Sequence, residues 1–179
     1  MTDSELKAAL DELFDRQLLF HGYTPFMRDY DLVIYESVDP ASGLSPRHRR
    51  FRFRFCTEAT VRSRVRPDVW SRSLSDDLVQ QEHVTMESTG YVWGVRGQEL
   101  YPGATIVRES ERARYWHEQV GVPFWEVQIE ANAHEIRLVF SDLSVADIES
   151  GYAAFAVASD GVAERFAEGS KIPLSPPDE

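Results

Sequence analysis

Residues 47–55, RHRRFRFRF, alternate cationic and aromatic side chains, and this alternation constrains the fold more than any other feature of the chain. A period of two puts alternate side chains on opposite faces of a β-strand, so the phenylalanines are predicted to face a core and the arginines to face outward. The pattern continues beyond position 55, with apolar or small residues at most odd positions and arginine at most even ones. The inward set comprises Phe51, Phe53, Phe55, Ala59, Val61 and Val65.

A continuous strand over residues 49–66 would span about 60 Å, at about 3.3 Å per residue. Ordinary strands are much shorter. We therefore expect a bend or bulge near residues 56–58, which would divide the arginine-rich segment into two strands.

Two helices are predicted from capping signals and apolar spacing. Thr2 and Glu5 form a capping box at the start of the chain. The second helix begins at Ser110, covers residues near 110–120, and ends at Gly121 and Pro123. The residues predicted to be buried are Leu6, Leu10, Leu13, Phe14 and Leu18 at the N-terminus, and Ala113, Trp116 and Val120 in the second helix.

The strand signals predict two hairpins. Residues 29–38 precede the arginine-rich strand and form the first hairpin with it, and residues 124–145 form the second. The acidic stretch at residues 140–149 is assigned to turns. Residues 89–107 read as one or two glycine-interrupted strands, and residues 151–157 as an edge strand. The two hairpins share a loose pattern, for which duplication and chance similarity are equally good explanations.

The expected class is therefore α+β: a mostly antiparallel β-sheet with an N-terminal helix and a second helix packed on it. A chain of 179 residues suits one compact domain, which we assign to residues 1–168. Residues 169–179 form a proline-rich tail that is predicted to be disordered.

Charge is distributed unevenly. Residues 47–72 hold nine arginines and two acidic residues, a net +7, which leaves −18 for the rest of a chain whose total is −11. An acidic surface disfavours nucleic acid and anionic membranes and favours a basic protein partner. High acidity also keeps a protein in solution, so the charge alone does not establish a partner.

The outward arginine face is the first candidate surface. Arginines two residues apart on one strand lie about 7 Å apart, close to phosphate spacing, so they suit an anion or an acidic partner. Nucleic-acid binders usually have stacking aromatics on the same face, whereas here the phenylalanines point to the core. Alternatively, the arginines pair with carboxylates of neighbouring strands, namely Asp29, Asp31, Glu126 and Glu130. The candidate residues are Arg50, Arg52, Arg54, Arg62 and Arg64.

The second candidate is an apolar ligand pocket lined by residues 90–103. This stretch holds Tyr91, Trp93, Tyr101 and four glycines, and His21 is its proposed polar neighbour. The same residues equally suit core packing, because glycine permits sheet bends and tryptophan is a large core side chain. Neither phosphate-binding glycine pattern is present, and we predict no cofactor by those routes.

No catalytic residue or metal ligand is predicted. The histidines lack metal-binding spacing, and the sequence does not show whether His21, His117 and His134 converge in space. A structural hydrogen bond is the expected role of His21. Cys56, the only cysteine, either carries a lowered pKa beside the arginines or turns inward at the bend, where it would be inert. No sequence motif supports enzymatic activity, and the sequence does not exclude it.

The expected location is the cytoplasm. The sequence has no apolar run of transmembrane length and no recognisable signal peptide, and its single cysteine fits a reducing compartment. The oligomeric state is not predicted.

Three stretches resemble a known family: HGYTPFMRDYDLVIY, GYVWGVRGQELYPGA and FWEVQIEANAHEIRLVFSDL. They are similar to the YxiG-like domain family of uncharacterised Gram-positive bacterial proteins, over residues 10–157. The resemblance implies no activity and no catalytic residues. Small acidic β-rich bacterial proteins also look like toxin-immunity proteins, an analogy at the level of fold only.

Two functions follow as hypotheses. The first is a non-enzymatic protein-binding module, of the inhibitor or immunity type, because the chain is acidic and lacks catalytic motifs. The second is a small-ligand-binding protein or enzyme that uses the aromatic, glycine-rich stretch. A pocket joining Tyr91, Trp93, Tyr101 and His21 would support the second.

Overall fold

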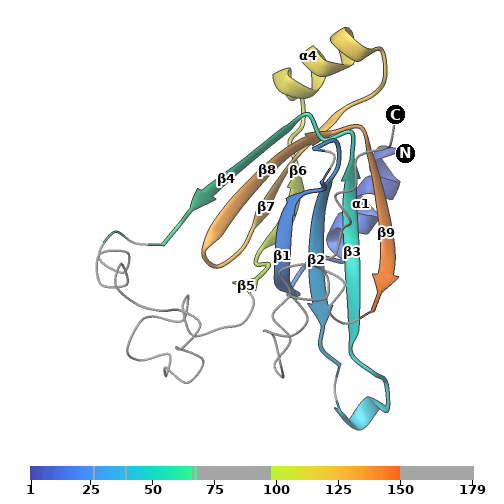
Figure 1. The fold of residues 1–179 in the computed structure, drawn as a ribbon, viewed down its shortest axis with the longest axis vertical. Coiled ribbons are helices and arrows are strands. Elements are labelled where there is room, and N and C mark those ends of the chain that lie inside the picture. Colours follow the sequence, from blue (N-terminus) through green and yellow to red (C-terminus); the bar gives the residue numbers. More distant parts are fainter. Residues whose placement is uncertain (26, 39, 66, 68–97, 150–179) are drawn as a thin grey trace, which may run out of the picture.

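The computed structural model describes residues 1–25, 27–38, 40–65, 67 and 98–149. Within these residues the chain forms two antiparallel β-sheets, two α-helices and a short 3₁₀ helix, Pro40–Ser42 (Figure 1). The predicted α+β class with antiparallel pairing is confirmed. The strands are divided between two sheets instead of one, and the sheets share a hydrophobic core.

The first sheet has five strands and the second has four. In spatial order the five-stranded sheet contains β5 (Gln98–Glu99), β1 (Gln17–Tyr23), β2 (Tyr30–Glu36), β3 (Arg47–Arg54) and β9 (Asp142–Ile148). The four-stranded sheet contains β4 (Glu58–Ser63), β8 (His134–Phe140), β7 (Trp125–Glu130) and β6 (Gly103–Ile106).

Both predicted hairpins are present. β2 pairs with β3, with Leu32 opposite Phe51, and β7 pairs with β8, with Val127 opposite Leu138. These four side chains are fully buried, since they face the space between the sheets. The core also holds Phe53, whose ring meets Phe140 edge to face at a centroid distance of 4.8 Å.

Two strands differ from the sequence prediction. β1 occupies residues assigned to the end of the first helix and to a turn, and β9 occupies residues assigned to a turn. β9 pairs with β3 and sends Leu143 and Val145 against the core. The predicted edge strand at residues 151–157 and the predicted tail lie outside the described residues.

The N-terminal helix α1 (Asp3–Asp11) begins with the predicted capping box. The Thr2 hydroxyl accepts a hydrogen bond from the Glu5 backbone at 3.3 Å, and the Glu5 carboxylate accepts one from the Thr2 backbone at 2.7 Å. Three leucines of the predicted stripe, Leu6, Leu10 and Leu13, are buried. Leu18 is buried as part of β1.

Phe14 was predicted to be buried and is instead exposed. The reason is that α1 ends before it, at Asp11, and the helical spacing no longer applies. The backbone of Phe14 packs closely on Gly103, where an added Cβ would lie 3.4 Å from the Phe14 Cα. Gly103 has a φ of +95°, so a larger residue there would be strained as well as crowded.

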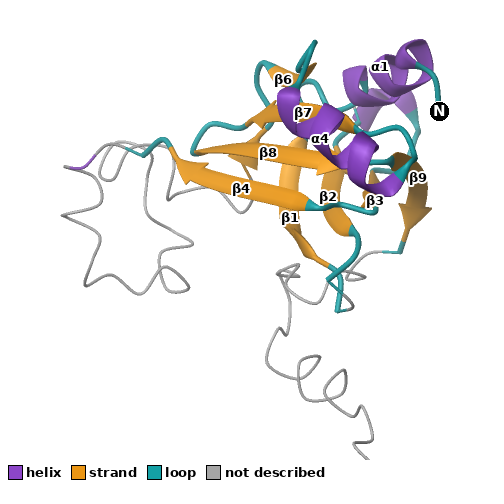
Figure 2. Ribbon diagram, turned by 90° about the horizontal axis from the view of Figure 1, so that it is seen from above, coloured by secondary structure: helices purple, strands orange, loops and turns teal. Residues whose placement is uncertain are grey.

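The second helix, α4 (Glu111–Val120), lies on the outer face of the four-stranded sheet across β7 and β8 (Figure 2). Ser110 caps its start, and Gly121, with a φ of +79°, ends it in the left-handed conformation, as predicted. Ala113 packs with Phe124 and Val139, and Trp116 is partly buried against them. Val120 was predicted to be buried but is 53% exposed, because the last turn of α4, residues 117–120, has no buried side chain.

The arginine-rich segment bends at residues 55–57, as predicted, and passes there from one sheet to the other. β3 pairs with β9 in the five-stranded sheet, whereas β4 pairs with β8 in the four-stranded sheet. Phe55 has a φ of +50°, which interrupts the alternation. Phe55 is consequently 44% exposed and Cys56 is buried, so the predicted inward position of Phe55 is wrong. Val61, in β4, is also exposed at 43%, contrary to prediction.

None of the described helices is long and apolar enough to cross a membrane.

Candidate functional site

The five candidate arginines are divided by the bend between two strands in different sheets. Arg50, Arg52 and Arg54 belong to β3, an interior strand, and Arg62 and Arg64 lie on or just after β4. They therefore do not form one continuous cationic surface.

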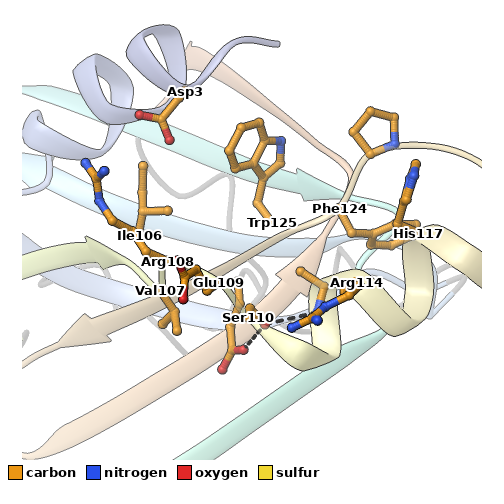
Figure 3. A pocket seen from close by; sticks show the side chains of 13 residues that line it. Asp3, Ile106, Val107, Arg108, Glu109, Ser110, Arg114, His117, Phe124 and Trp125 are labelled. Atoms are coloured by element: carbon orange, nitrogen blue, oxygen red, sulfur yellow. Dashed lines mark hydrogen bonds between the residues drawn. The ribbon is translucent and has the colours of Figure 1, made fainter.

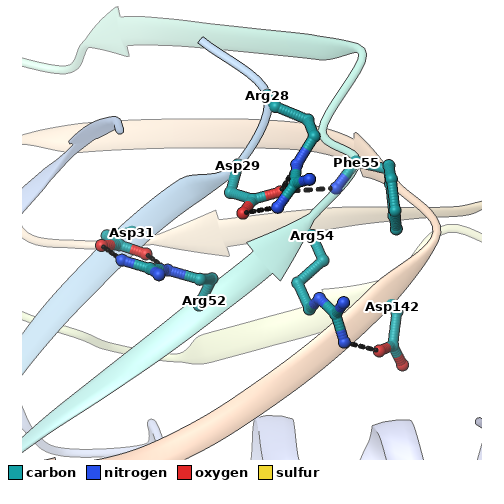
Figure 4. Close-up of polar contacts among 7 residues, drawn as sticks. All are labelled: Arg28, Asp29, Asp31, Arg52, Arg54, Phe55 and Asp142. Carbon is teal, nitrogen blue, oxygen red and sulfur yellow. Dashed lines mark hydrogen bonds and ion pairs between the residues drawn. The ribbon is translucent and has the colours of Figure 1, made fainter. Parts of the chain in front are cut away.

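Two of the three candidate arginines in β3 are held by carboxylates of neighbouring strands (Figure 4). Arg52 donates two hydrogen bonds to Asp31 in β2, both of 2.8 Å. Arg54 pairs with Asp142 in β9 at 3.3 Å. Arg50 lies between Val33 and Ala146 in the adjacent strands and is partly buried. The predicted pairing with carboxylates is thus present on β3, and Asp31 is one of the acids named for it.

The β4 region carries a second set of ion pairs. Arg64 contacts Glu130 at 2.5 Å and Glu135 at 2.9 Å, and Glu130 was also named from sequence. Arg62 lies opposite Glu135 in β8 and is exposed. Among the described residues, none forms an ion pair with Arg62.

Asp29 stabilises the bend at residues 55–57 through hydrogen bonds. Its carboxylate is buried, accepts a 3.0 Å hydrogen bond from the Phe55 backbone, and receives two hydrogen bonds from Arg28 (Figure 4). Arg28 also lies 5.0 Å from the centroid of the Phe55 ring. Hydrogen bonds from Arg28 lower the pKa of Asp29, so this carboxylate stays charged at neutral pH.

Cys56 faces the core, which was one of the two alternatives for it. Its thiol donates to the Glu58 carbonyl at 3.3 Å, and burial raises its pKa to about 12. A thiol with this pKa is almost entirely protonated at neutral pH, and it is therefore a poor nucleophile.

His21 has the structural role that was expected. Its Nδ1 shares a 2.7 Å hydrogen bond with the Tyr30 hydroxyl, and its ring stacks on the Tyr30 ring. His134 lies next to it at a centroid distance of 6.2 Å, and its own Nδ1 bonds Gln98 at 2.9 Å. Burial lowers the pKa of both histidines, and the neighbouring His134 lowers that of His21 further.

The third histidine does not join this pair. His117 is on α4 and bonds the Val122 carbonyl at 2.9 Å. In the part of the chain that the structure describes, no three histidine, cysteine, aspartate or glutamate side chains are grouped closely enough to hold a metal ion.

The predicted aromatic pocket is described only in part. Tyr91 and Trp93 lie outside the described residues. Tyr101 is 61% exposed and packs on Phe14 at a centroid distance of 5.7 Å. His21 and Tyr101 therefore have different partners, and the described residues do not bring them together.

The described residues also form a cleft that the sequence did not predict. It has a volume of about 780 Å³ and lies between the start of α1, the chain leaving β6, and α4 (Figure 3). We call it the α1–α4 cleft. Its apolar lining comprises Ile106, Val107, Ala113, Pro123, Phe124 and Trp125, and its polar lining comprises Asp3, Arg108, Glu109, Ser110, Arg114, His117 and Glu126.

Within this cleft, the Ser110 hydroxyl and the Glu126 carboxylate hold the start of α4 in place. The Ser110 hydroxyl accepts a 3.0 Å hydrogen bond from the Ala113 backbone and donates one to the buried Glu126 carboxylate (Figure 3). Glu126 thus lies at the N-terminus of α4 and links it, through the Ser110 hydroxyl, to β7. Ser110 bonds a carboxylate rather than a histidine, and His117 bonds a backbone carbonyl, so the three residues do not form a serine hydrolase triad.

Sequence reasoning named Ser110 as a helix start and Glu126 as an outward acid, but it did not connect them. Their contact depends on how α4 folds back on β7, which no local pattern encodes.

No curated protein sequence matches this chain significantly. A family model described as YxiG-like protein matches residues 2–158, which is most of the chain. The matched region includes every described strand and both described α-helices. On this match, the chain belongs to the YxiG-like protein family.

Proposed function

We propose that this protein is a non-enzymatic protein-binding module and that the α1–α4 cleft is its contact site. The cleft itself carries the proposal: about 780 Å³ of open space lined by apolar side chains and edged by charged ones. Binding sites commonly combine an apolar floor with a few polar groups at the rim. A protruding apolar side chain of a partner fits this arrangement.

The chemistry of the described residues supports binding over catalysis. Ser110, Glu126 and His117 are engaged in hydrogen bonds that position α4. Cys56 is buried and protonated. A catalytic nucleophile needs an adjacent base and access to a substrate.

The partner that we propose is a basic protein. The chain carries a net charge of −11, which accelerates association with a cationic surface and makes that association sensitive to salt. The rim of the cleft holds side chains of both signs, including Asp3 and Arg114. Long-range attraction would therefore come from the whole acidic molecule and anchoring from the apolar floor. A cytoplasmic location is part of the same proposal.

The test is capture of partners at low salt from cells that produce the protein, comparing the natural chain with two tryptophan variants. Val107→Trp fills the cleft, whereas Val120→Trp places the same residue on the exposed end of α4, outside the cleft. We expect a stoichiometric basic protein to be retained by the natural chain and by Val120→Trp and to be lost by Val107→Trp. Equal retention by all three would move the contact site elsewhere, and retention of no protein would contradict the proposed function.

A further inference from the structure

β4 is an edge strand of the four-stranded sheet, and among the described strands only β8 pairs with it. Figures 1 and 2 show it along the outer side of that sheet, at the opposite edge from β6. An edge strand offers unpaired backbone groups to any extended chain that can align with it. β3, which precedes it in the same arginine-rich segment, is paired on both sides.

The pairing with β8 determines which backbone groups of β4 point outward. The Arg64 backbone donates to the Ala133 carbonyl at 2.6 Å, in register with the strand pairing. In an antiparallel pair the hydrogen-bonded positions alternate, so Thr60 and Arg62 also bond β8. The N–H and C=O groups of Ala59 and Val61 consequently point away from β8.

These outward groups match those of a second copy of the same strand. In an antiparallel arrangement about a two-fold axis, Ala59 of one chain lies opposite Val61 of the other, and the two residues exchange hydrogen bonds. Thr60 then lies opposite Thr60 of the second copy, on the axis. This register forms two hydrogen-bonded residue pairs without disturbing the bonds to β8.

The side chains of β4 are complementary in the same register. Glu58 lies opposite Arg62 of the second copy, and by symmetry the opposite-charge contact forms twice. Within its own chain Glu58 already accepts a 2.8 Å hydrogen bond from the Trp116 indole and pairs with Arg112 at 3.3 Å, so Arg62 of the second copy shares this carboxylate. Arg62 is the candidate arginine that is exposed and in no ion pair among the described residues. Val61, which is 43% exposed in one chain, gains an apolar neighbour in Ala59 of the second copy. The strand therefore presents both charge and backbone complementarity to itself.

We propose that the protein forms a homodimer through antiparallel pairing of β4 with β4 of a second copy, centred on Thr60. The two four-stranded sheets join into one continuous sheet of eight strands. Because β6 lies at the edge opposite β4, the two α1–α4 clefts lie toward opposite ends of this sheet. The strand is short, so we expect dissociation constants in the micromolar range or weaker, as for small interfaces.

Cysteine cross-linking tests both the dimer and its register. Thr60→Cys places two cysteines opposite each other at a Cα separation of about 4.5 Å, which a disulfide can bridge. Arg62→Cys is the matched control on the same face of β4, because its two copies are offset by four residues, about 13 Å. The natural Cys56 is buried and does not compete.

We expect oxidised Thr60→Cys to run as a dimer on a non-reducing gel and Arg62→Cys to remain a monomer. Linking of Arg62→Cys but not of Thr60→Cys would overturn the register. Failure of both to link at millimolar concentration would overturn the dimer and leave the edge to a different partner.

Sedimentation of the unmodified chain provides an independent test. We expect a concentration-dependent shift from 20.5 kDa toward twice that mass. Arg62→Glu should raise the dissociation constant at least tenfold, because it places like charges opposite each other twice. Arg54→Glu makes the same change of charge on β3 and should leave the dissociation constant unchanged. Equal effects of the two variants, or a monomer at every concentration, would contradict the proposal.

Discussion

β3 and β4 come from one arginine-rich segment, but they have different surroundings. β3 lies between β2 and β9, its phenylalanines are fully buried, and Arg52 and Arg54 pair with carboxylates of those strands. β4 lies at a sheet edge, where Val61 and Arg62 are exposed. The same alternation of residues therefore builds an interior strand on one side of the bend and an open edge on the other. Position in the sheet, more than composition, decides whether an arginine stabilises the fold or is available to a partner.

The largest difference between the two strands should appear in their inward side chains. Phe53→Ala removes a fully buried ring from β3 and should lower the free energy of unfolding by about 3–5 kcal/mol. Val61→Ala in β4 should lower it by about 0.5 kcal/mol or less, since Val61 is exposed. Urea titration of dilute protein measures both values. Similar losses for the two variants would remove the distinction between the strands.

The bend that separates the strands depends on Asp29. Asp29→Ala leaves the Phe55 N–H without its acceptor and Arg28 without its ion pair, and we expect a loss of about 2 kcal/mol near neutral pH. Asp29→Asn keeps one acceptor oxygen and should recover part of the loss. Both values come from chemical denaturation monitored by tryptophan fluorescence. An unchanged midpoint in Asp29→Ala would mean that the bend is stable without this carboxylate.

The same residue predicts a pH dependence. The pKa of Asp29 is lower in the folded chain than in the unfolded chain, so its contribution to stability is complete above the unfolded value, about 4. The contribution is lost as the pH falls from there through the folded pKa. The difference in unfolding free energy between the natural protein and Asp29→Asn should therefore be constant near pH 6–7 and shrink below about pH 4. A difference that does not vary with pH would exclude the charge of Asp29 as the cause.

The Asp31–Arg52 pair should contribute less. A double-mutant cycle with Asp31→Ala and Arg52→Ala should give a coupling energy of about 1 kcal/mol, because the pair is bidentate and partly buried. The cycle is needed because each side chain also contacts other groups. A coupling energy of zero would mean that the contact between the two strands does not stabilise the fold.

The smallest effects should come from the exposed arginines. Arg54→Ala and Arg62→Ala should each change the free energy of unfolding by about 0.5 kcal/mol or less in dilute protein, because exposed ion pairs contribute little. A loss well above 1 kcal/mol for Arg62→Ala would show that this side chain supports the fold of a single chain.

Local patterns predicted the parts of this fold that depend on neighbouring residues. The capping box at Thr2, the cap at Ser110 and the two hairpins follow from short-range signals, and the structure contains all of them. The bend near Cys56 followed from strand length alone. β9 could also have been found, since Leu143 and Val145 alternate with small and acidic residues as in a half-buried strand.

The features that the sequence did not predict depend on contacts between distant segments. The division into two sheets follows from the bend at residues 55–57, where Phe55 has a positive φ and Cys56 turns inward. Beyond the bend the odd residues face the core again, as Ala59 does. Phe14 and Val120 fit the apolar spacing of the two predicted helices, but each lies beyond the last helical residue that packs on the core, so both side chains are exposed. The α1–α4 cleft is built by a helix at the start of the chain and another more than 100 residues later, so no local pattern identifies it.

Amide hydrogen exchange of β3 and β4, measured residue by residue at low and high protein concentration, tests the central comparison most directly. The amides of Phe51 and Phe53 should be protected at both concentrations, because β3 is paired on both sides. In β4, Thr60 and Arg62 should be protected by β8, whereas Val61 should exchange rapidly in dilute protein and become protected as the concentration rises. Slow exchange of Val61 at every concentration would contradict an open edge at β4. Rapid exchange at every concentration would contradict the pairing of β4 with a second copy.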